Sequence, residues 1–174
     1  MKPNIGAGDS GETKILGCNL NKASPLIGLI GSLDELNSFI GMARSFVNFK
    51  DLDEILKDIQ SDIFLIGSEL GGAKLDKKVD ENSVKKLESY IVKLEAEIEE
   101  LKNFIYYSGS KSSTILQVCR AVCRRVERDA HIISKDFMIR KEVLSYLNRL
   151  SDLLFTIARV LNKREGFREE IWKI

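Results

Sequence analysis

Apolar residues recur along most of the chain at alternating spacings of three and four residues. A half-buried strand would alternate with a period of two, whereas this spacing places apolar side chains on one face of an α-helix. The pattern is clear in four stretches, at Leu33, Leu36, Ile40, Ala43 and Val47; Leu52, Leu56, Ile59, Ile63, Ile66 and Leu70; Val84, Leu87, Ile91, Leu94, Ile98 and Leu101; and Val143, Leu147, Leu150, Leu154, Ile157 and Leu161. A less regular fifth stretch includes Ile115, Val118, Val122, Val126 and Ile133. The sequence therefore predicts amphipathic helices, and no segment alternates for long enough to predict a strand.

The predicted helices span roughly residues 26–47, 51–73, 81–102, 111–135 and 141–163. Gly71 and Gly72 are expected to end the second helix. A serine of the Ser108-Gly109-Ser110 segment can cap the fourth by accepting from a free amide. Both prolines, Pro3 and Pro25, precede the helical region, so nothing in it forces a break. Long helices with short connections favour an all-α, up-and-down five-helix bundle.

The whole chain, residues 1–174, is predicted to be a single domain with three parts. Residues 1–25 are polar, with several glycines between Asn4 and Gly11, and are expected to form a loop with exposed backbone amides. Residues 26–163 would form the bundle. Residues 164–174 would be a short tail that either packs back or stays loose.

Composition argues against several classes of function. The net charge is +1, and a general nucleic-acid binder needs a basic surface. No apolar run approaches the roughly 20 residues that cross a bilayer, and the N-terminus lacks the apolar core of a signal peptide. Three cysteines make no disulfide framework, and Cys119 and Cys123 lie near the apolar face of their helix. We expect a cytoplasmic protein that binds neither nucleic acid nor membrane.

The single histidine, His131, argues against metal and triad chemistry. A ferritin-like di-iron site needs two Glu-x-x-His motifs. Glu127 lies one turn from His131, but these two side chains alone do not make a metal site. The protein's metal ligands, if any, stay unknown from the sequence.

The segment CRAVCRRVER carries the strongest chemical signal. Arg120, Arg124 and Arg128 follow one another at steps of four, so they share one helical face across an arc of about 80°. Like charges at this spacing repel, and Glu127 offsets only part of the repulsion. Arginine forks suit phosphate oxygens, so the face predicts an anion site. The alternative is a solvated face that pairs with neighbouring acids.

Three other segments carry polar residues that suit a ligand. The loop GAGDSGET could offer backbone amides to an anion, with Lys22 nearby, although such a terminus can simply be flexible. Asp34 and Asn37 flank the apolar stripe of the first helix, where Gly28, Gly31 and Gly41 would permit close approach of a helix or ligand. Asn148 and Asp152 flank the stripe of the last helix, as structural glue or as contacts to a sugar hydroxyl.

Together these segments resemble the PduO-type ATP:cob(I)alamin adenosyltransferases. The family pattern has a G-D-x-G-x-T loop, then G-x-x-D-E-L-N-S-x-I-G, F-x-x-P-G-G, R-x-x-x-R-R-x-E-R and Y-L-N-R-L-S-D. The chain has GDSGET at 8–13, GSLDELNSFIG at 31–41, RAVCRRVER at 120–128 and YLNRLSD at 146–152. The resemblance implies a ferritin-like bundle that forms a homotrimer and binds ATP between subunits.

The resemblance also implies roles for individual residues. Arg120 and Arg124 would hold the triphosphate, Asp34 would pair with Arg120 across the subunit interface, and Phe104 would pack beneath the corrin. The remaining matches to ATP-binding positions are Gly8, Asp9, Gly11, Thr13, Lys22, Glu127, Arg128 and Asn148. The expected substrates are ATP and cobalamin or a related corrinoid, with Mg²⁺ on the triphosphate. The expected partners are a reductase and an enzyme that accepts adenosylcobalamin.

The implied reaction is displacement at the 5′ carbon of ATP by reduced cobalt, with triphosphate as the leaving group. Three departures keep a second hypothesis open. Gly6 and Ala7 replace a basic residue and a threonine, Gln117 replaces a histidine, and IYYSGS at 105–110 lacks the usual proline and double glycine. The second hypothesis is a bundle of this family that binds a corrinoid or nucleotide without catalysis. A third is an interaction bundle whose arginine face meets acidic partners.

Overall fold

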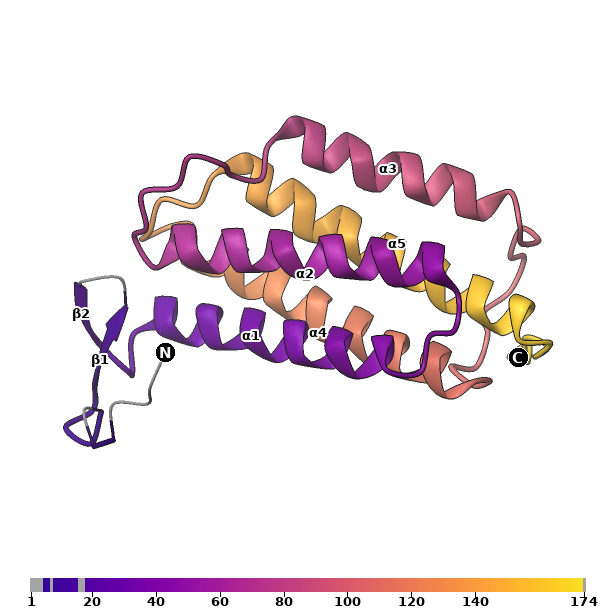
Figure 1. Cartoon of the computed structure of the whole chain (residues 1–174), viewed down its shortest axis with the longest axis horizontal. Coiled ribbons are helices and arrows are strands. Elements are labelled where there is room, and N and C mark those ends of the chain that lie inside the picture. Colours follow the sequence, from indigo (N-terminus) through magenta and orange to yellow (C-terminus); the bar gives the residue numbers. More distant parts are fainter. Residues whose placement is uncertain (1–4, 7, 16–17, 174) are drawn as a thin grey trace.

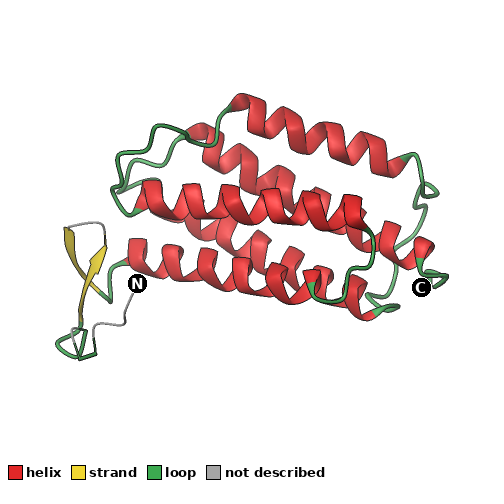
Figure 2. Ribbon diagram, in the orientation of Figure 1, coloured by secondary structure: helices red, strands yellow, loops and turns green. Residues whose placement is uncertain are grey.

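A computed structural model describes residues 5–6, 8–15 and 18–173 of the chain. It contains a short β-hairpin and then five helices (Figure 1). The elements are β1 (Glu12–Ile15), β2 (Cys18–Asn21), α1 (Pro25–Arg44), α2 (Lys50–Leu70), α3 (Glu81–Glu95), α4 (Lys111–Ile133) and α5 (Lys141–Arg164). Successive helices run in opposite directions along the bundle (Figure 2). The predicted all-α, up-and-down five-helix bundle is therefore confirmed.

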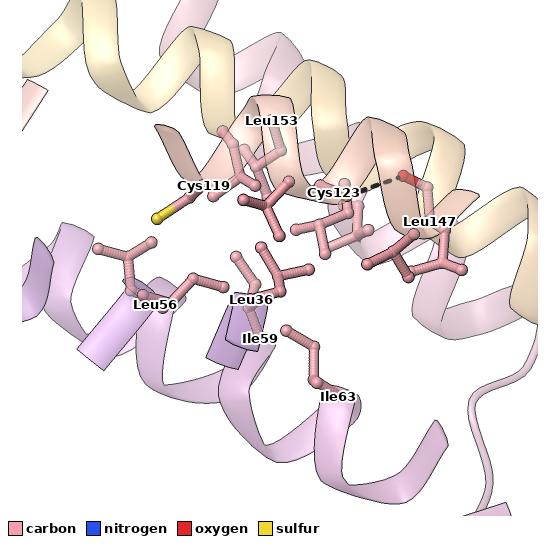
Figure 3. Close-up of a cluster of buried hydrophobic side chains, with 14 of the residues drawn as sticks. Leu36, Leu56, Ile59, Ile63, Cys119, Cys123, Leu147 and Leu153 are labelled. Atoms are coloured by element: carbon pink, nitrogen blue, oxygen red, sulfur yellow. Dashed lines mark hydrogen bonds between the residues drawn. The ribbon is translucent and has the colours of Figure 1, made fainter. Parts of the chain in front are cut away.

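The core lies between the five helices, each of which contributes buried apolar residues. α4 packs against both α5 and α1, α1 packs against α2, and α3 packs against α5. Figure 3 shows the core, where Leu36, Ile59 and Leu153 meet the buried cysteines of α4. Burying this apolar surface is the main favourable term in forming the bundle.

Cys119 and Cys123 belong to this core, as predicted. Cys119 and Cys123 are fully buried, and the Cys123 thiol donates to the backbone carbonyl of Leu147 at 3.3 Å (Figure 3). Burial raises the pKa of the Cys119 thiol to about 12. A thiol that stays protonated at neutral pH is a poor nucleophile and metal ligand, so these cysteines serve packing.

The N-terminal segment differs from the prediction. It was expected to be a loop without strands, but β1 and β2 form an antiparallel hairpin in which Thr13 pairs with Leu20. Each strand has four residues, which is too short for alternation to stand out in a polar, glycine-containing segment. The prediction that the chain contains no strand was wrong.

α3 is shorter than predicted. It ends at Glu95 rather than near residue 102, although the apolar spacing continues to Ile98 and Leu101. The chain beyond Glu95 is held by α5: Arg159 donates to the Glu99 carbonyl at 2.7 Å, and Lys163 donates to the Glu97 carbonyl. Basic side chains thus bind carbonyls that a longer helix would have paired internally, which favours the early end.

Other helix ends follow the predictions more closely. The Ser110 hydroxyl accepts from the Ser113 amide at 3.2 Å and caps α4. α2 ends at Leu70, directly before Gly71 and Gly72, and Gly72 has a φ of 87° that favours glycine. The Pro25 side chain lies in the first turn of α1, where its missing amide is not needed.

The C-terminal tail packs back on the bundle. Ile105 and Ile171 form an isolated antiparallel bridge, and the Trp172 amide donates to the Phe104 carbonyl at 2.9 Å. Of the two alternatives for residues 164–174, the packed arrangement is the one observed. The tail is therefore attached to the loop between α3 and α4.

The expectation that no apolar stretch is long enough to cross a bilayer has one exception among the described helices. α1 is the one described helix whose length and composition would allow it to cross a membrane. The core helix of a soluble protein can meet the same criterion, and α1 packs between α2 and α4 with the exposed Asp34 and Glu35 midway along it. Its apolar side chains thus serve the bundle.

Candidate functional site

The face of α4 that carries the arginines points away from the core. Cys123 and Val126 are fully buried on the opposite face, whereas Arg124 and Arg128 are exposed and Arg120 is half-buried. The prediction that Val118 belongs to the core was wrong, because its side chain is 44% exposed. Val118 stands two turns before Arg125, so it shares that flank of the helix rather than the buried side.

The three arginines have no acidic partner among the described residues. No carboxylate of the described chain lies within 4.0 Å of the guanidinium of Arg120, Arg124 or Arg128. This sets the three apart from six other arginines of the chain, which do form ion pairs. Arginines that do have such partners are Arg44, Arg125, Arg140, Arg149, Arg159 and Arg164. The alternative that the arginine face pairs with neighbouring acids of its own chain is therefore contradicted. This face therefore meets solvent, an outside anion or an acidic partner molecule.

Part of the predicted site comes together beside Arg124. The Asn148 amide on α5 donates to the Glu127 carboxylate on α4 at 2.8 Å. Together with Arg124 and Arg128, these residues line a cleft of about 460 Å³. Glu127 therefore orients Asn148 rather than neutralising an arginine by contact, and the cleft joins two donors of different kinds: charged guanidinium groups and a neutral amide.

Arg120 lies in a neighbouring cleft that also reaches Arg128. Its guanidinium carbon stands 4.6 Å from the centre of the Tyr107 ring and 5.8 Å from that of Phe155. Its Nε donates to the Gln117 side chain at 2.8 Å. The arginine face thus extends from the Asn148 cleft towards the loop that carries Phe104.

Phe104 lines a large pocket between the loop that follows α3 and the C-terminal tail. Its side chain is 77% exposed, and it meets Trp172 edge-on with ring centres 6.2 Å apart. The pocket is about 910 Å³ in volume and also contains Tyr107 and Phe155. Such a volume with several aromatic walls suits a large, flat, mostly apolar ligand.

Three aromatic residues at this pocket were not predicted from the sequence: Tyr107, Phe155 and Trp172. A signal was available for two of them. Tyr107 follows Phe104 within the aromatic run FIYY, and Trp172 is the chain's single tryptophan, placed in an otherwise polar tail. Phe155 gave no signal, because it lies next to the apolar stripe of the last helix and resembles the core residues around it.

The predicted residues of the N-terminal segment contact one another. The Lys22 ammonium donates to the Gly8 carbonyl at 2.6 Å, and the Lys22 amide donates to the Gly11 carbonyl at 2.8 Å. Asp9 and Thr13 belong to the same turn and hairpin, which projects from the bundle near the start of α1 (Figure 1). Within one protomer the structure does not bring this segment to the arginine face. Ala7, one of the departures, lies outside the described residues.

Asp34 is exposed on α1 and has no ion-pair or hydrogen-bond partner among the described side chains. Its neighbour Glu35 instead pairs with Arg125 of α4. The expected close approach is seen at Gly41, where an added Cβ would lie 3.3 Å from the Gln60 amide nitrogen. At Gly28 and Gly31 an added Cβ would meet nothing described within 4 Å, so this flank of α1 is open in the single chain.

No group of three His, Cys, Asp or Glu side chains within residues 5–6, 8–15 and 18–173 is placed to hold a metal ion. A magnesium ion bound to a nucleotide keeps several waters and takes most other ligands from phosphate oxygens. The side chains present are therefore compatible with Mg²⁺ that arrives on a triphosphate.

Comparison with known sequences gives consistent matches. The family model described as cobalamin adenosyltransferase matches residues 4–161. A corrinoid adenosyltransferase of Bacillus subtilis is 41% identical over 172 residues, covering 95% of this chain and 89% of the relative. A cobalamin adenosyltransferase of Cupriavidus metallidurans is 36% identical, covering 95% of this chain and 91% of the relative.

Solved structures give the same result at the level of the fold. A variant of the PduO-type ATP:corrinoid adenosyltransferase from Lactobacillus reuteri, complexed with cobalamin and ATP, superposes with a TM-score of 0.91 at 29% identity, covering 99% of this chain and 100% of that one. Another variant of the same type, complexed with ATP, gives a TM-score of 0.90 at 30% identity, covering 98% of this chain and 100% of that one.

Proposed function

The chain belongs to the cobalamin adenosyltransferase family, and we propose that it transfers the 5′-deoxyadenosyl group of ATP to the reduced cobalt of a corrinoid. The products are adenosylcobalamin and triphosphate. The observation that carries the proposal is the arginine face of α4, which has no carboxylate partner in the described chain and lies beside an aromatic pocket large enough for a macrocycle. An anion site next to a flat apolar site fits this pair of substrates.

The chemistry asks little of side-chain nucleophiles. Cobalt(I) supplies the electron pair that forms the bond to the 5′ carbon, while the bond from that carbon to the triphosphate oxygen breaks and its electrons leave with the triphosphate. Negative charge therefore grows on the leaving group. Fixed cationic donors aimed at that charge lower the barrier, and the reactivity of the metal belongs to the corrinoid.

The described residues suit separate parts of this task. Arg120 and Arg124 would hold the triphosphate, with Arg128 beside them in both clefts. Asn148, oriented by Glu127, would donate to the nucleotide sugar. Phe104 would pack beneath the corrin and keep the lower axial ligand away from cobalt. Mg²⁺ bound to the phosphates would spread the same negative charge.

A homotrimer completes the proposal. Asp34 is exposed without a partner in the described chain, and the flank of α1 at Gly28 and Gly31 is open, which suits contact with another subunit. In that assembly Asp34 would pair with Arg120 of a neighbour. The N-terminal segment with Gly8, Asp9, Gly11, Thr13 and Lys22 would then enclose ATP at an interface rather than within its own protomer.

The cellular setting is also part of the proposal. Transfer to cobalt(I) needs a reducing environment, so we place the enzyme in the cytoplasm with a reductase that delivers the electron. An adenosylcobalamin-dependent enzyme would accept the product. The whole chain acts as one domain, in which residues 1–25 close over ATP, residues 26–163 form the bundle and residues 164–174 support the corrinoid loop.

An anaerobic assay with ATP, Mg²⁺ and chemically reduced cobalamin tests the proposal. The expected result is light-sensitive adenosylcobalamin together with one triphosphate for each corrinoid converted. ATP binding without formation of adenosylcobalamin would reject catalysis. It would favour the second hypothesis, a bundle that binds a corrinoid or nucleotide without catalysis, which the altered loop at Tyr107 and Ser108 suggested. ATP that neither binds nor raises the melting temperature would favour an interaction bundle.

A further inference from the structure

Arg120 is held in place by residues at which this chain departs from the family pattern. Tyr107 stands where the pattern F-x-x-P-G-G has its proline, and Gln117 stands where a histidine is usual. In the fold both departures converge on one guanidinium: the Tyr107 ring lies 4.6 Å from its central carbon, and the Gln117 side chain accepts from its Nε at 2.8 Å. Two separate sequence changes thus meet at a single arginine.

The contacts leave the useful part of Arg120 available. Nε is occupied by Gln117, whereas the two terminal nitrogens have no acceptor among the described residues. A guanidinium carries five N–H groups, four of them on these two nitrogens. In the proposed trimer Asp34 of the partner subunit would accept from some of these four, and the rest would face the triphosphate. The Tyr107 and Phe155 rings restrict the guanidinium from its aromatic-facing side. A side chain with many rotamers is therefore largely ordered before any ligand arrives.

The same contact joins the two substrate sites. Tyr107 follows Phe104 by three residues, in a loop tied to the tail by the Ile105–Ile171 bridge and the Trp172–Phe104 contact. Phe155 lies between Arg120 and Arg159, and Arg159 binds Glu169 of the tail at 2.6 Å. A continuous set of contacts therefore runs from the Phe104 loop through Tyr107 to Arg120.

We propose that Tyr107 is a positioning residue for Arg120, whose guanidinium it and Gln117 hold ready for the triphosphate. The inference rests on the proposed function and assigns a role to a residue that touches neither reacting atom. Pre-ordering lowers the cost of binding, because less side-chain freedom is lost when ATP arrives. The role belongs to the aromatic ring and not to the hydroxyl group, since the ring faces the guanidinium.

The test compares three variants with the wild-type chain. Tyr107→Leu is expected to raise the dissociation constant of MgATP about three- to fivefold, the factor expected for losing one exposed cation–π contact. The KM for ATP should rise with it. The dissociation constant of MgATP is measured without corrinoid, because Tyr107 also lines the Phe104 pocket and its replacement can change the KM for cobalamin as well. Tyr107→Phe should behave as wild type. Tyr106→Leu is the matched control, because the adjacent tyrosine is similarly exposed but has no such arginine contact among the described residues.

A double-mutant cycle identifies Arg120 as the target. In an Arg120→Gln background, Tyr107→Leu should leave the dissociation constant of MgATP unchanged, since the group that it positions is gone. Calorimetry without corrinoid makes this measurable even if turnover is lost, and melting temperatures show that each variant is folded. Tyr107 is 57% exposed, so its replacement should leave the fold intact.

The outcomes separate the inference from the function. Wild-type ATP affinity in Tyr107→Leu, with normal turnover, would overturn the positioning role and leave the transferase standing. Equal losses in Tyr107→Leu and Tyr107→Phe would assign the effect to the hydroxyl and also overturn it, as would a change confined to the KM for cobalamin. If the wild-type chain itself binds no MgATP, the proposed function fails first and the inference falls with it.

Discussion

Arginines occupy two contrasting environments in this bundle. Near the start of α5, the Arg140 guanidinium makes paired contacts with the Glu69 carboxylate at 2.6 and 2.9 Å and also donates to the Val79 carbonyl at 2.7 Å. In the middle of α4, Arg124 has no carboxylate within reach among the described residues, although it repels arginines on either side. In the first environment the N–H groups of the arginine donate to acceptors within the protein. In the second they have no carboxylate acceptor among the described residues.

The difference separates stability from function. A buried-edge pair such as Arg140–Glu69 holds α2 to α5, and losing one partner leaves the other poorly solvated. An unpaired stripe weakens the helix slightly, because like charges at one-turn spacing repel. An anion bound at the stripe offsets that cost. Substitutions in the two environments should therefore separate cleanly into loss of activity and loss of stability.

Arg124→Ala should give the largest effect, on activity alone. We expect kcat/KM for ATP to fall about 10²- to 10³-fold, the range seen when one donor to a developing negative charge is removed. The free energy of unfolding should stay within about 0.5 kcal/mol of wild type, because Arg124 is exposed and ion-pairs with no described residue. Anaerobic kinetics and urea unfolding on the same preparation measure both quantities. Near-normal turnover in a folded Arg124→Ala protein would refute the anion site.

Arg140→Ala should show the reverse pattern. The Glu69 side chain is 14% exposed and would lose its bidentate partner, so we expect about 1–3 kcal/mol of lost stability in urea unfolding. Activity at low temperature should be retained. A double variant, Arg140→Leu with Glu69→Leu, is the matched control, because it removes both charges and should recover much of the loss. An unchanged unfolding midpoint would show that this pair contributes no more than an exposed one.

The pH dependence of stability sharpens the same contrast. Hydrogen bonds from Arg140, reinforced by Lys78, hold the pKa of the Glu69 carboxyl below its ordinary value despite some desolvation. A carboxyl whose pKa is lowered on folding contributes stability that is present above its unfolded pKa of about 4.3 and is lost as pH falls through the folded value. Stability should therefore drop on acidification from about pH 4.3, and Glu69→Gln should make that part of the curve shallower. A Glu69→Gln curve with the same acid slope as wild type would exclude this carboxyl as a contributor.

The fold was largely predictable because burial has a period that the sequence displays. Leu36, Ile59 and Leu147 all fell in the predicted stripes and all are buried. The failures came where local pattern competes with tertiary contacts. α3 ended early because Arg159 and Lys163, about sixty residues away in sequence, bind carbonyls beyond Glu95. Nothing in a single segment announces such a contact.

The site was predictable in its charges but not in its arrangement. The spacing of Arg120, Arg124 and Arg128 gave the shared face directly, because one helix sets their geometry. The separation of Arg120 from the Asn148 cleft could not be predicted, since it depends on Tyr107 in a loop without a period. The roles of Asp34 and of the N-terminal segment stay predictions, because they involve a subunit interface that a single chain does not contain.

Arg149→Ala should give the smallest effect and tests what makes an arginine structural. Arg149 forms ion pairs with Glu88 at 3.2 Å and with Asp152 at 2.9 Å, yet the two carboxylates are 48% and 52% exposed. Water solvates such charges well after the pair is broken, so we expect no more than about 0.5 kcal/mol of lost stability and unchanged kinetics. Urea unfolding beside Arg140→Ala provides the comparison. If Arg149→Ala proved as destabilising as Arg140→Ala, the number of ion pairs rather than their burial would set the contribution of an arginine to stability. The arginines of α4 would then contribute little to stability because no acids lie nearby, and not because they are exposed.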